Sequence, residues 1–183
     1  MERGLVERAR RGDREAYELL ARTSARRLYL IAYRITRDSD AADDAVQQAL
    51  VAIWREVPKL RDPDRFEAWS DRLVVRFAVA EAKRGQRVSM RVRESTPDEP
   101  RATDEVSTVA LRDELERAFR RLSPEHRAVV VLHHYVGLPI AEIAAALGVP
   151  YGTVGSRLHY ALRELRAALG ATEEGAAMGG QPA

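Results

Sequence analysis

The sequence predicts an all-α protein made of two small helical domains, a bundle and then a helix-turn-helix unit, joined by a flexible acidic linker. Three observations favour this fold class. Apolar residues recur at helical spacing, aromatic residues make up only 6% of the chain, and Gly and Pro collect at the boundaries between periodic stretches. With 45% hydrophobic residues the chain can bury a core, while 32% charged residues suit short helices with solvated outer faces.

The first domain is expected over residues 1–88 as a helical bundle. Asp13 suits the N-cap of its first long helix, and Pro58 is expected to end the second. Gly85 is expected to stop the third. The second helix carries a regular apolar stripe, which predicts that Trp54 lies in the core. The stripe consists of Val46, Leu50, Ile53, Trp54 and Val57.

A stretch without helical period separates the two domains. Residues 89–107 hold two prolines and are predicted to form the linker. Fully extended, such a linker spans on the order of 60 Å, so the two domains need not touch. Residues 108–169 return to helical spacing, with Ser123 as an N-cap. The small, polar and Gly-rich tail, residues 170–183, is expected to be disordered.

Charge is unevenly distributed although the net charge is only +2. Residues 1–93 carry an excess of six positive charges, residues 94–105 an excess of four negative charges, and residues 106–169 an excess of two positive charges. Two basic modules separated by an acidic strip indicate a polyanion touched at two places. Solvated helix faces account for the charge alone equally well.

The chain contains no cysteine, which excludes a disulfide framework and thiolate metal sites. Its N-terminus lacks the apolar core of a signal peptide. No stretch approaches the ~18 apolar residues of a membrane span. We therefore expect a cytoplasmic protein that does not contact a membrane.

The most informative stretch is "IAEIAAALGVPYGTVGSRLHYALREL", residues 140–165. An Ala-rich amphipathic helix stops at Gly148, which can take the left-handed conformation that ends a helix, and a second helix follows a short turn. The predicted buried stripe of this second helix is Val154, Leu158, Ala161, Leu162, Leu165 and Leu169. Its predicted outward residues are Gly155, Ser156, His159, Tyr160 and Arg163.

This is helix-turn-helix geometry, in which the second helix is free to enter a DNA major groove. Short side chains near its N-terminus would let the backbone approach another surface closely. Many helical hairpins bind nothing, but the polar outer face favours DNA because Arg157 and Arg163 are available for phosphates or guanine.

Two segments resemble a known family. "LSPEHRAVVVLHHYVGLPIAEIAAALGVPYGTVGSRLHYALRELRAAL" resembles region 4 of extracytoplasmic-function (ECF) sigma factors, with its Leu-Ser-Pro-Glu-x-Arg, Glu-Ile-Ala and Gly-Thr-Val-x-Ser-Arg motifs. "DAADDAVQQALVAIWREVPKLRDPDRFEAW" resembles region 2 of the same family. The resemblance covers about residues 13–169. It implies a group 4 member of the sigma-70 family, an RNA polymerase sigma factor for promoter recognition and transcription initiation.

The resemblance also implies which half binds what. The N-terminal bundle would bind the β′ clamp helices of core RNA polymerase and open the minus-ten element of promoter DNA. The C-terminal domain would bind the minus-thirty-five element as duplex and contact the β flap. Relatives are often held inactive by an anti-sigma factor, a further partner on which these residues carry no signal.

Carried over position by position, the resemblance implies three sets of contact residues. DNA contacts at the upstream element would come from Arg127, Gly152, Thr153, Gly155, Ser156, Arg157, His159, Tyr160 and Arg163. DNA contacts at the minus-ten element would come from Arg61, Arg65, Phe66, Trp69, Arg72, Arg76, Lys83 and Arg84. Polymerase contacts would come from Asp44, Gln47, Gln48 and Arg55.

The sequence departs from the family pattern at several of these positions. Ser70 follows Trp69 where Leu is common, and Arg76 stands where relatives often have an Asn that handles the flipped minus-ten base. In the second helix of the hairpin, Gly155 and Tyr160 replace common basic residues. Fewer phosphate contacts should weaken duplex binding relative to typical relatives.

No cofactor, metal or catalytic site is expected. His133 and His134 are adjacent on a helix and point about 100° apart, so they would not share an ion. The chain has no convincing Ser/His/Asp set, Gly-rich phosphate loop or carboxylate pair, so we expect neither an enzyme nor a small-molecule substrate. Two rival hypotheses are an autonomous helix-turn-helix regulator that needs no core polymerase and a helical adaptor that binds no DNA.

Overall fold

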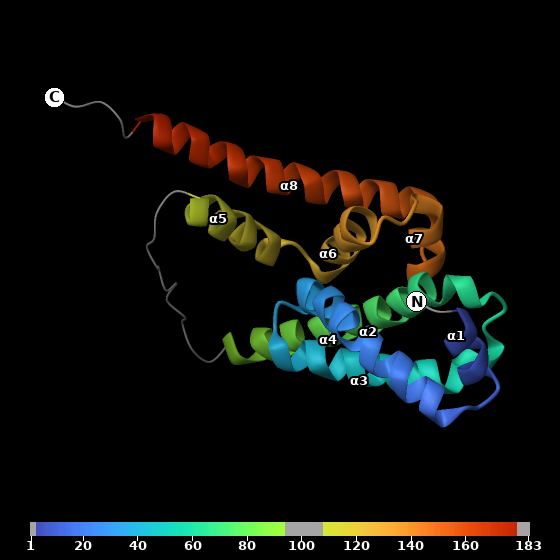
Figure 1. Cartoon of the computed structure of the whole chain (residues 1–183). Coiled ribbons are helices and arrows are strands. Elements are labelled where there is room, and N and C mark those ends of the chain that lie inside the picture. The colour runs from blue at the N-terminus through green and yellow to red at the C-terminus, as the bar shows by residue number, and fades with distance from the viewer. Residues whose placement is uncertain (1–2, 94–107, 179–183) are drawn as a thin grey trace.

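The computed structural model describes residues 3–93 and 108–178, and for residues 88–93, 108–113 and 169–178 it describes the backbone alone. All regular structure in these stretches is helical, as the sequence predicted. A bundle of the first four α-helices is followed by a second helical layer that lies across one side of it (Figure 1). The elements are α1 (Arg3–Arg10), α2 (Arg14–Thr36), α3 (Ser39–Glu56), η1 (Val57–Lys59), η2 (Pro63–Arg65), α4 (Phe66–Arg93), α5 (Thr108–Arg121), α6 (Pro124–Val130), η3 (Val131–Tyr135), α7 (Ile140–Leu147) and α8 (Tyr151–Met178).

Two side-chain caps predicted from the sequence are present. The Asp13 carboxylate accepts a hydrogen bond from the backbone N–H of Ala16 at 3.0 Å and begins α2. The Ser123 hydroxyl accepts one from the backbone N–H of His126 at 3.2 Å and begins α6, with Pro124 in the first turn. Each cap supplies an acceptor to an N–H without an intrahelical partner, which stabilises a helix by about 1 kcal/mol.

The N-terminal bundle is built from α2, α3 and α4, with α1 packed at one end. Its core includes Leu20, Leu28, Ile53 and Val74, none of which is more than 1% exposed. Ala45 of α3 is fully buried, and its small side chain lets the neighbouring helices approach closely.

The C-terminal layer is organised around α8, against which α5, α6 and α7 pack. Leu122, Val129, Ile143 and Val154 are at most 1% exposed in this core. After α6 the helix widens into the π-helical turn η3. Gly137, with a φ of 82°, then lets the chain reverse toward α7.

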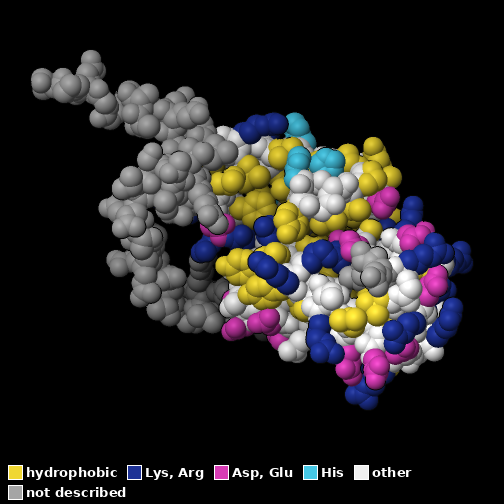
Figure 2. All heavy atoms as spheres, in the orientation of Figure 1, with side chains coloured by type: hydrophobic (Ala, Val, Ile, Leu, Met, Phe, Trp, Pro, Cys, Tyr) yellow, Lys and Arg dark blue, Asp and Glu magenta, His cyan; other side chains and the backbone are white. Residues whose placement is uncertain are grey.

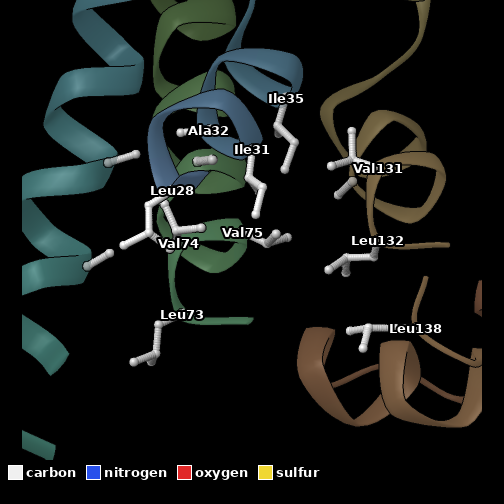
Figure 3. Close-up of a cluster of buried hydrophobic side chains, with 14 of the residues drawn as sticks. Leu28, Ile31, Ala32, Ile35, Leu73, Val74, Val75, Val131, Leu132 and Leu138 are labelled. Carbon is white, nitrogen blue, oxygen red and sulfur yellow. The ribbon is translucent and has the colours of Figure 1, made fainter. Parts of the chain in front are cut away.

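The two halves share one continuous hydrophobic core. Ile31 and Ile35 of α2 and Val75 of α4 face Val131 and Leu132 of η3 (Figure 3). None of the five side chains is more than 2% exposed. Burying a side chain of this size stabilises by about 1.5–3 kcal/mol, so this contact favours the packed arrangement. The linker leaves the two domains free to touch or to separate, and in this arrangement they touch.

Two helices run past their predicted ends. α4 passes through Gly85 and continues to Arg93, so residues 89–93 of the predicted linker are helical. A glycine inside a helix costs only about 1 kcal/mol relative to alanine, which does not stop a helix that its neighbours favour. α8 likewise includes residues 170–178 of the predicted tail. The rest of the predicted linker and tail lies outside the described residues.

A buried polar network ties the start of α4 to α2. Arg27 Nη2 donates to Ser70 Oγ at 3.0 Å, and Arg27 Nη1 donates to the carboxylate of Asp71. Ser70 Oγ donates in turn to the carbonyl of Glu67 at 2.9 Å. Ser70 is fully buried, so the departure from the family's leucine has a physical reason: this serine is the partner of Arg27.

The replacement of Asp71 by Asn should change how stability depends on pH. Burial raises the pKa of Asp71 from 3.8 to about 6, although Arg27 acts in the opposite direction. Protonated Asp71 therefore favours folding, and this contribution is lost as pH rises through about 6. As pH rises from about 4 to about 7, the free energy of unfolding of Asp71→Asn should increase by about 1–3 kcal/mol relative to that of the native chain, as measured by urea unfolding. A stability difference that stays constant with pH would contradict the raised pKa.

Candidate nucleic-acid interface

α7 and α8 form the hairpin that the sequence predicted. α7 ends at Gly148, whose φ of 64° is left-handed. The backbone N–H of Val149 donates to the carbonyl of Ala144 at 3.1 Å and fixes the turn. α8 begins at Tyr151, directly after this short turn, and runs along the outer side of the C-terminal layer (Figure 1).

α8 has one buried and one exposed face, as predicted. Val154, Leu158 and Ala161 are at most 8% exposed and belong to the core. The solvent-exposed residues of the opposite face include Ser156, His159, Tyr160 and Arg163. The face that the sequence assigned to DNA is therefore accessible in this arrangement.

Small residues near the beginning of α8 leave its backbone open. A Cβ added at Gly152 or Gly155 would meet no atom within 4 Å, so packing inside the chain does not require either glycine. Ser156 Oγ donates to the carbonyl of Thr153 at 3.0 Å and keeps its lone pairs free to accept a hydrogen bond. This end of the helix can approach another surface closely.

The next turns of α8 add aromatic rings and positive charge. The Arg163 guanidinium lies 4.9 Å from the centroid of the Tyr160 ring, and the His159 and Tyr160 centroids are 5.9 Å apart. Arg157 is half-buried on the same helix. This strip combines hydrogen-bonding groups with cations, the combination that contacts base edges and phosphates.

Arg127 does not share this exposure. It is 5% exposed and lies one turn before Val131, on the side of α6 that meets α2. Its Nε has no hydrogen-bond partner among the described residues. Burial and the nearby positive charge of Arg37 together lower the pKa of Arg127 to about 10. The expected contact of Arg127 with DNA therefore requires a different arrangement of the two halves.

Four of the eight residues expected at the minus-ten element, Trp69, Arg72, Arg76 and Lys83, lie on the side of α4 that faces the C-terminal layer. Trp69, Arg72 and Arg76 line a hollow of about 210 Å³. Ala145 and Ala146 of α7 line the same hollow. The first helix of the hairpin thus stands over the surface assigned to opened DNA.

Two ion pairs join α4 to the C-terminal layer, and a third, between Arg37 after α2 and Glu116 of α5, also joins the two halves. Arg72 Nη1 lies 3.5 Å from the Glu142 carboxylate of α7. Lys83 Nζ lies 2.6 Å from the Glu125 carboxylate of α6. Carboxylates thus hold two cations that the resemblance assigned to the promoter, and they would compete with DNA phosphates for them.

The other minus-ten candidates differ in accessibility. Phe66 is 2% exposed, so its ring belongs to the core and cannot stack on a base here. Arg61 and Arg65 are exposed in the connection between α3 and α4. Arg84 is exposed as well and forms an ion pair of 3.4 Å with Glu81 of its own helix.

On α3, three of the four residues expected to meet polymerase are exposed, namely Asp44, Gln47 and Arg55. Gln48 differs from them. Its Nε2 donates to Glu81 Oε1 of α4 at 2.7 Å, which holds the two helices together. Gln48 therefore has a structural partner inside the bundle.

An apolar patch beside these residues was missed by the sequence analysis. We define the α2–α3 patch as Tyr17, Val51 and Trp54, which line one hollow. Trp54 is 42% exposed and Val51 50%, so the prediction that Trp54 lies in the core is wrong. Ile53 takes the inward position, and the next residue along a helix is rotated about 100° away from it. Adjacent large apolar residues at 53 and 54 were the signal that could have revealed the patch.

Three further findings concern the part of the chain that the structure describes. It contains no group of three His, Cys, Asp or Glu side chains placed to hold a metal ion. None of its helices has the length and hydropathy to cross a bilayer. His133 Nδ1 lies 3.1 Å from the carbonyl of Leu138, a hydrogen bond within the layer.

Comparison with known proteins gives one family for both halves. Residues 20–88 match the family model of sigma-70 region 2, and residues 112–165 match that of sigma-70 region 4. The two matches follow one another in the order that the sequence motifs indicated.

Individual relatives agree with these matches. ECF RNA polymerase sigma factor SigL of Mycobacterium tuberculosis is 37% identical over 147 residues, which cover 78% of this chain and 82% of SigL. ECF RNA polymerase sigma factor SigE of Mycolicibacterium smegmatis is 33% identical over 85% of this chain, which spans only 63% of SigE. The structure of CnrH in complex with the cytosolic domain of CnrY has a TM-score of 0.60 at 26% identity, covering 92% of this chain and 97% of that one.

Charge reversal at Glu125 and Glu142 should loosen the contact between the halves. Replacing both with Lys turns two attractive pairs into repulsive ones, at a cost on the order of 1 kcal/mol per pair. Since the chain has no cysteine, dyes can be placed at Glu15→Cys and Ala167→Cys, two exposed positions, and energy transfer between them should fall. Glu164→Lys, an exposed change outside the contact, is the control. If energy transfer between the dyes stays the same in the double variant, the ion pairs of Glu125 and Glu142 do not hold the halves together.

Proposed function

Since this chain belongs to the ECF RNA polymerase sigma factors of the sigma-70 family, we propose that it directs core RNA polymerase to promoters by contacting DNA at two separate elements. The observation that carries the proposal is the exposed polar face of α8, in a helix-turn-helix joined to a second helical module. The two modules supply different contacts.

The upstream element would be bound as duplex by α8. An α-helix fits the major groove, and Gly152 and Gly155 let its backbone approach the bases. Ser156 and His159 offer hydrogen bonds to base edges. Arg163 offers a positive charge to a phosphate. Because these residues are exposed in the free chain, duplex binding by this face needs little local rearrangement.

The opened strand of the minus-ten element would lie along α4. Trp69 offers a surface for stacking, and Arg72 and Arg76 offer cations for the backbone of the strand. Arg61 and Arg65 extend this basic surface into the connection before α4.

This function requires the two modules to separate. In the free chain α7 stands over Trp69, Arg72 and Arg76, and Arg127 is buried without a partner for its Nε. Separation would expose all four residues at once. Because an unpaired buried charge destabilises the packed arrangement, contact of Arg127 with a phosphate would favour separation.

Polymerase would bind the exposed side of α3 together with the α2–α3 patch. An aromatic side chain amid polar neighbours is the arrangement found at the centres of protein interfaces. Trp54 and Val51 would supply the apolar contact, and Asp44, Gln47 and Arg55 the polar surroundings.

An autonomous regulator explains less of the molecule. Such a protein needs only the helices around α8, usually paired in a dimer. It leaves the match of residues 20–88 to sigma-70 region 2 and the α2–α3 patch without a role. The sigma factor hypothesis uses both.

Transcription in vitro tests the proposal directly. Purified core polymerase would be given a library of promoter fragments with and without the full chain, and the start sites sequenced. Initiation at defined sites only in the presence of the chain supports the proposal. A chain that fails to bind core polymerase would contradict it, and duplex binding in that case would favour the regulator.

Trp54→Ala should weaken binding to core polymerase by about 10- to 100-fold, because an aromatic residue at an interface centre contributes about 1.4–2.8 kcal/mol. Affinity would be measured by titrating labelled chain with core enzyme. The ring also packs on Tyr17, with 4.7 Å between the centroids, so thermal unfolding of the variant must show that it stays folded at the titration temperature. Arg26→Ala, an exposed change on α2, is the control. Equal affinities of both variants would place the polymerase contact elsewhere.

Arg163→Ala should reduce the salt dependence of binding to upstream-element duplex. A lost phosphate contact lowers the slope of log K against log salt by about 0.9. Anisotropy titrations of the full chain over a salt series measure this slope. Arg117→Ala, an exposed cation on α5, should leave it unchanged. An unaltered slope for the α8 variant would remove Arg163 from the interface.

A further inference from the structure

A basic hollow lies at the N-terminal end of the bundle, where α1 meets the connection between α3 and α4. Its lining residues are Glu7, Arg10, Arg11 and Pro58, and its volume is about 280 Å³. α1 and the turn after it, which supply Glu7, Arg10 and Arg11, precede the segment that matches sigma-70 region 2, which begins at residue 20. The resemblance assigned no role to this hollow.

Of the arginines in α1 and the turn after it, Arg10 and Arg11 remain available to bind an anion. Arg3 is paired with Glu7 at 3.0 Å, and Arg8 with Asp13 at 2.7 Å. Neither Arg10 nor Arg11 forms an ion pair with any described residue. The Nε of Arg10 is moreover buried with no hydrogen-bond partner there. An anion in the hollow would supply the acceptor that Arg10 lacks.

The only acid that lines the hollow, within the described part of the chain, is already engaged. Glu7 binds Arg3, and Arg3 also lies 2.9 Å from Asp64 of η2. These ion pairs are exposed, and α1 is held against the connection mainly by Val6 and Ala9, which are only 1% exposed. The arginines are thus presented by a fixed support, which reduces the entropy lost on binding.

The basic surface continues from the hollow toward α4. Lys59 directly follows Pro58, and Arg61 comes two residues later; both are exposed without an ion pair among the described residues. Arg65, which pairs with Asp62 at 3.9 Å, is the residue directly before α4. Figure 2 shows basic side chains, interspersed with acidic ones, at the end of the molecule where Figure 1 places α1. A strand lying along α4 would meet this surface where it leaves the helix.

We propose that this hollow binds the phosphates of single-stranded promoter DNA next to the minus-ten element, through Arg10 and Arg11. The inference rests on the proposed function, which places the opened strand on the adjoining segment. The planar guanidinium groups match phosphate oxygens in geometry as well as charge. Contact is to the backbone, so this site adds affinity and positions the strand and does not select bases.

The test uses the full chain and a labelled single-stranded DNA 20-mer of mixed sequence, with anisotropy followed over a salt series. Each lost phosphate contact with a single strand lowers the slope of log K against log salt by about 0.7, so Arg10→Ala/Arg11→Ala should lower it by about 1.4. Arg10→Lys/Arg11→Lys keeps both charges and should keep most of the slope. Arg22→Ala/Arg26→Ala, which removes two exposed cations of α2, is the matched control and should not change it.

The outcomes separate this inference from the proposed function. If Arg61→Ala lowers the slope but Arg10→Ala/Arg11→Ala does not, the strand uses the connection and not the hollow, and the inference falls while the proposed function stands. An equal loss in the α2 control would show general charge attraction and overturn it. Binding of the native chain to the strand that does not depend on salt would also overturn the inference. If the hollow variant loses affinity for core polymerase alone, the hollow is a protein contact and the inference is wrong.

Discussion

The apolar contact between the two halves decides which surfaces of this sigma factor are available. Ile31, Ile35 and Val75 on the bundle meet Val131 and Leu132 after α6, and all five are buried. With these side chains together, α7 stands over the α4 side that would hold opened DNA. The exposed face of α8 and the α2–α3 patch point elsewhere and remain free. One contact thus covers one of the two proposed nucleic-acid surfaces and leaves the other accessible.

The relative magnitudes of the interactions explain why this contact dominates. Ion pairs at a partly exposed boundary, such as those of Arg72 and Lys83, contribute about 0–1 kcal/mol each. Burial of Arg127 opposes the packed state, because its Nε is left without a partner. Apolar burial of several large side chains exceeds both. Separation of the modules therefore needs binding energy from outside, which polymerase and promoter DNA can supply together.

The hairpin could be predicted closely because its information is local. Gly148 ends α7 through its own backbone preference, and the period of α8 alone separates Val154 and Leu158 from His159. Trp54 could not be placed in the same way. Its neighbour Ile53 takes the single inward position, and which of two adjacent apolar residues does so depends on where α2 and α4 lie.

The sequence by itself determined the helical class, the order of the two modules, the caps at Asp13 and Ser123, and the outward face of α8, because these depend on residues within a few turns of one another. Only the tertiary structure decided that Arg127 is buried and that Arg72 and Arg76 of α4 lie beneath α7. The physical reason is that these properties arise from contacts between residues more than fifty positions apart, and helical period carries no information about such contacts.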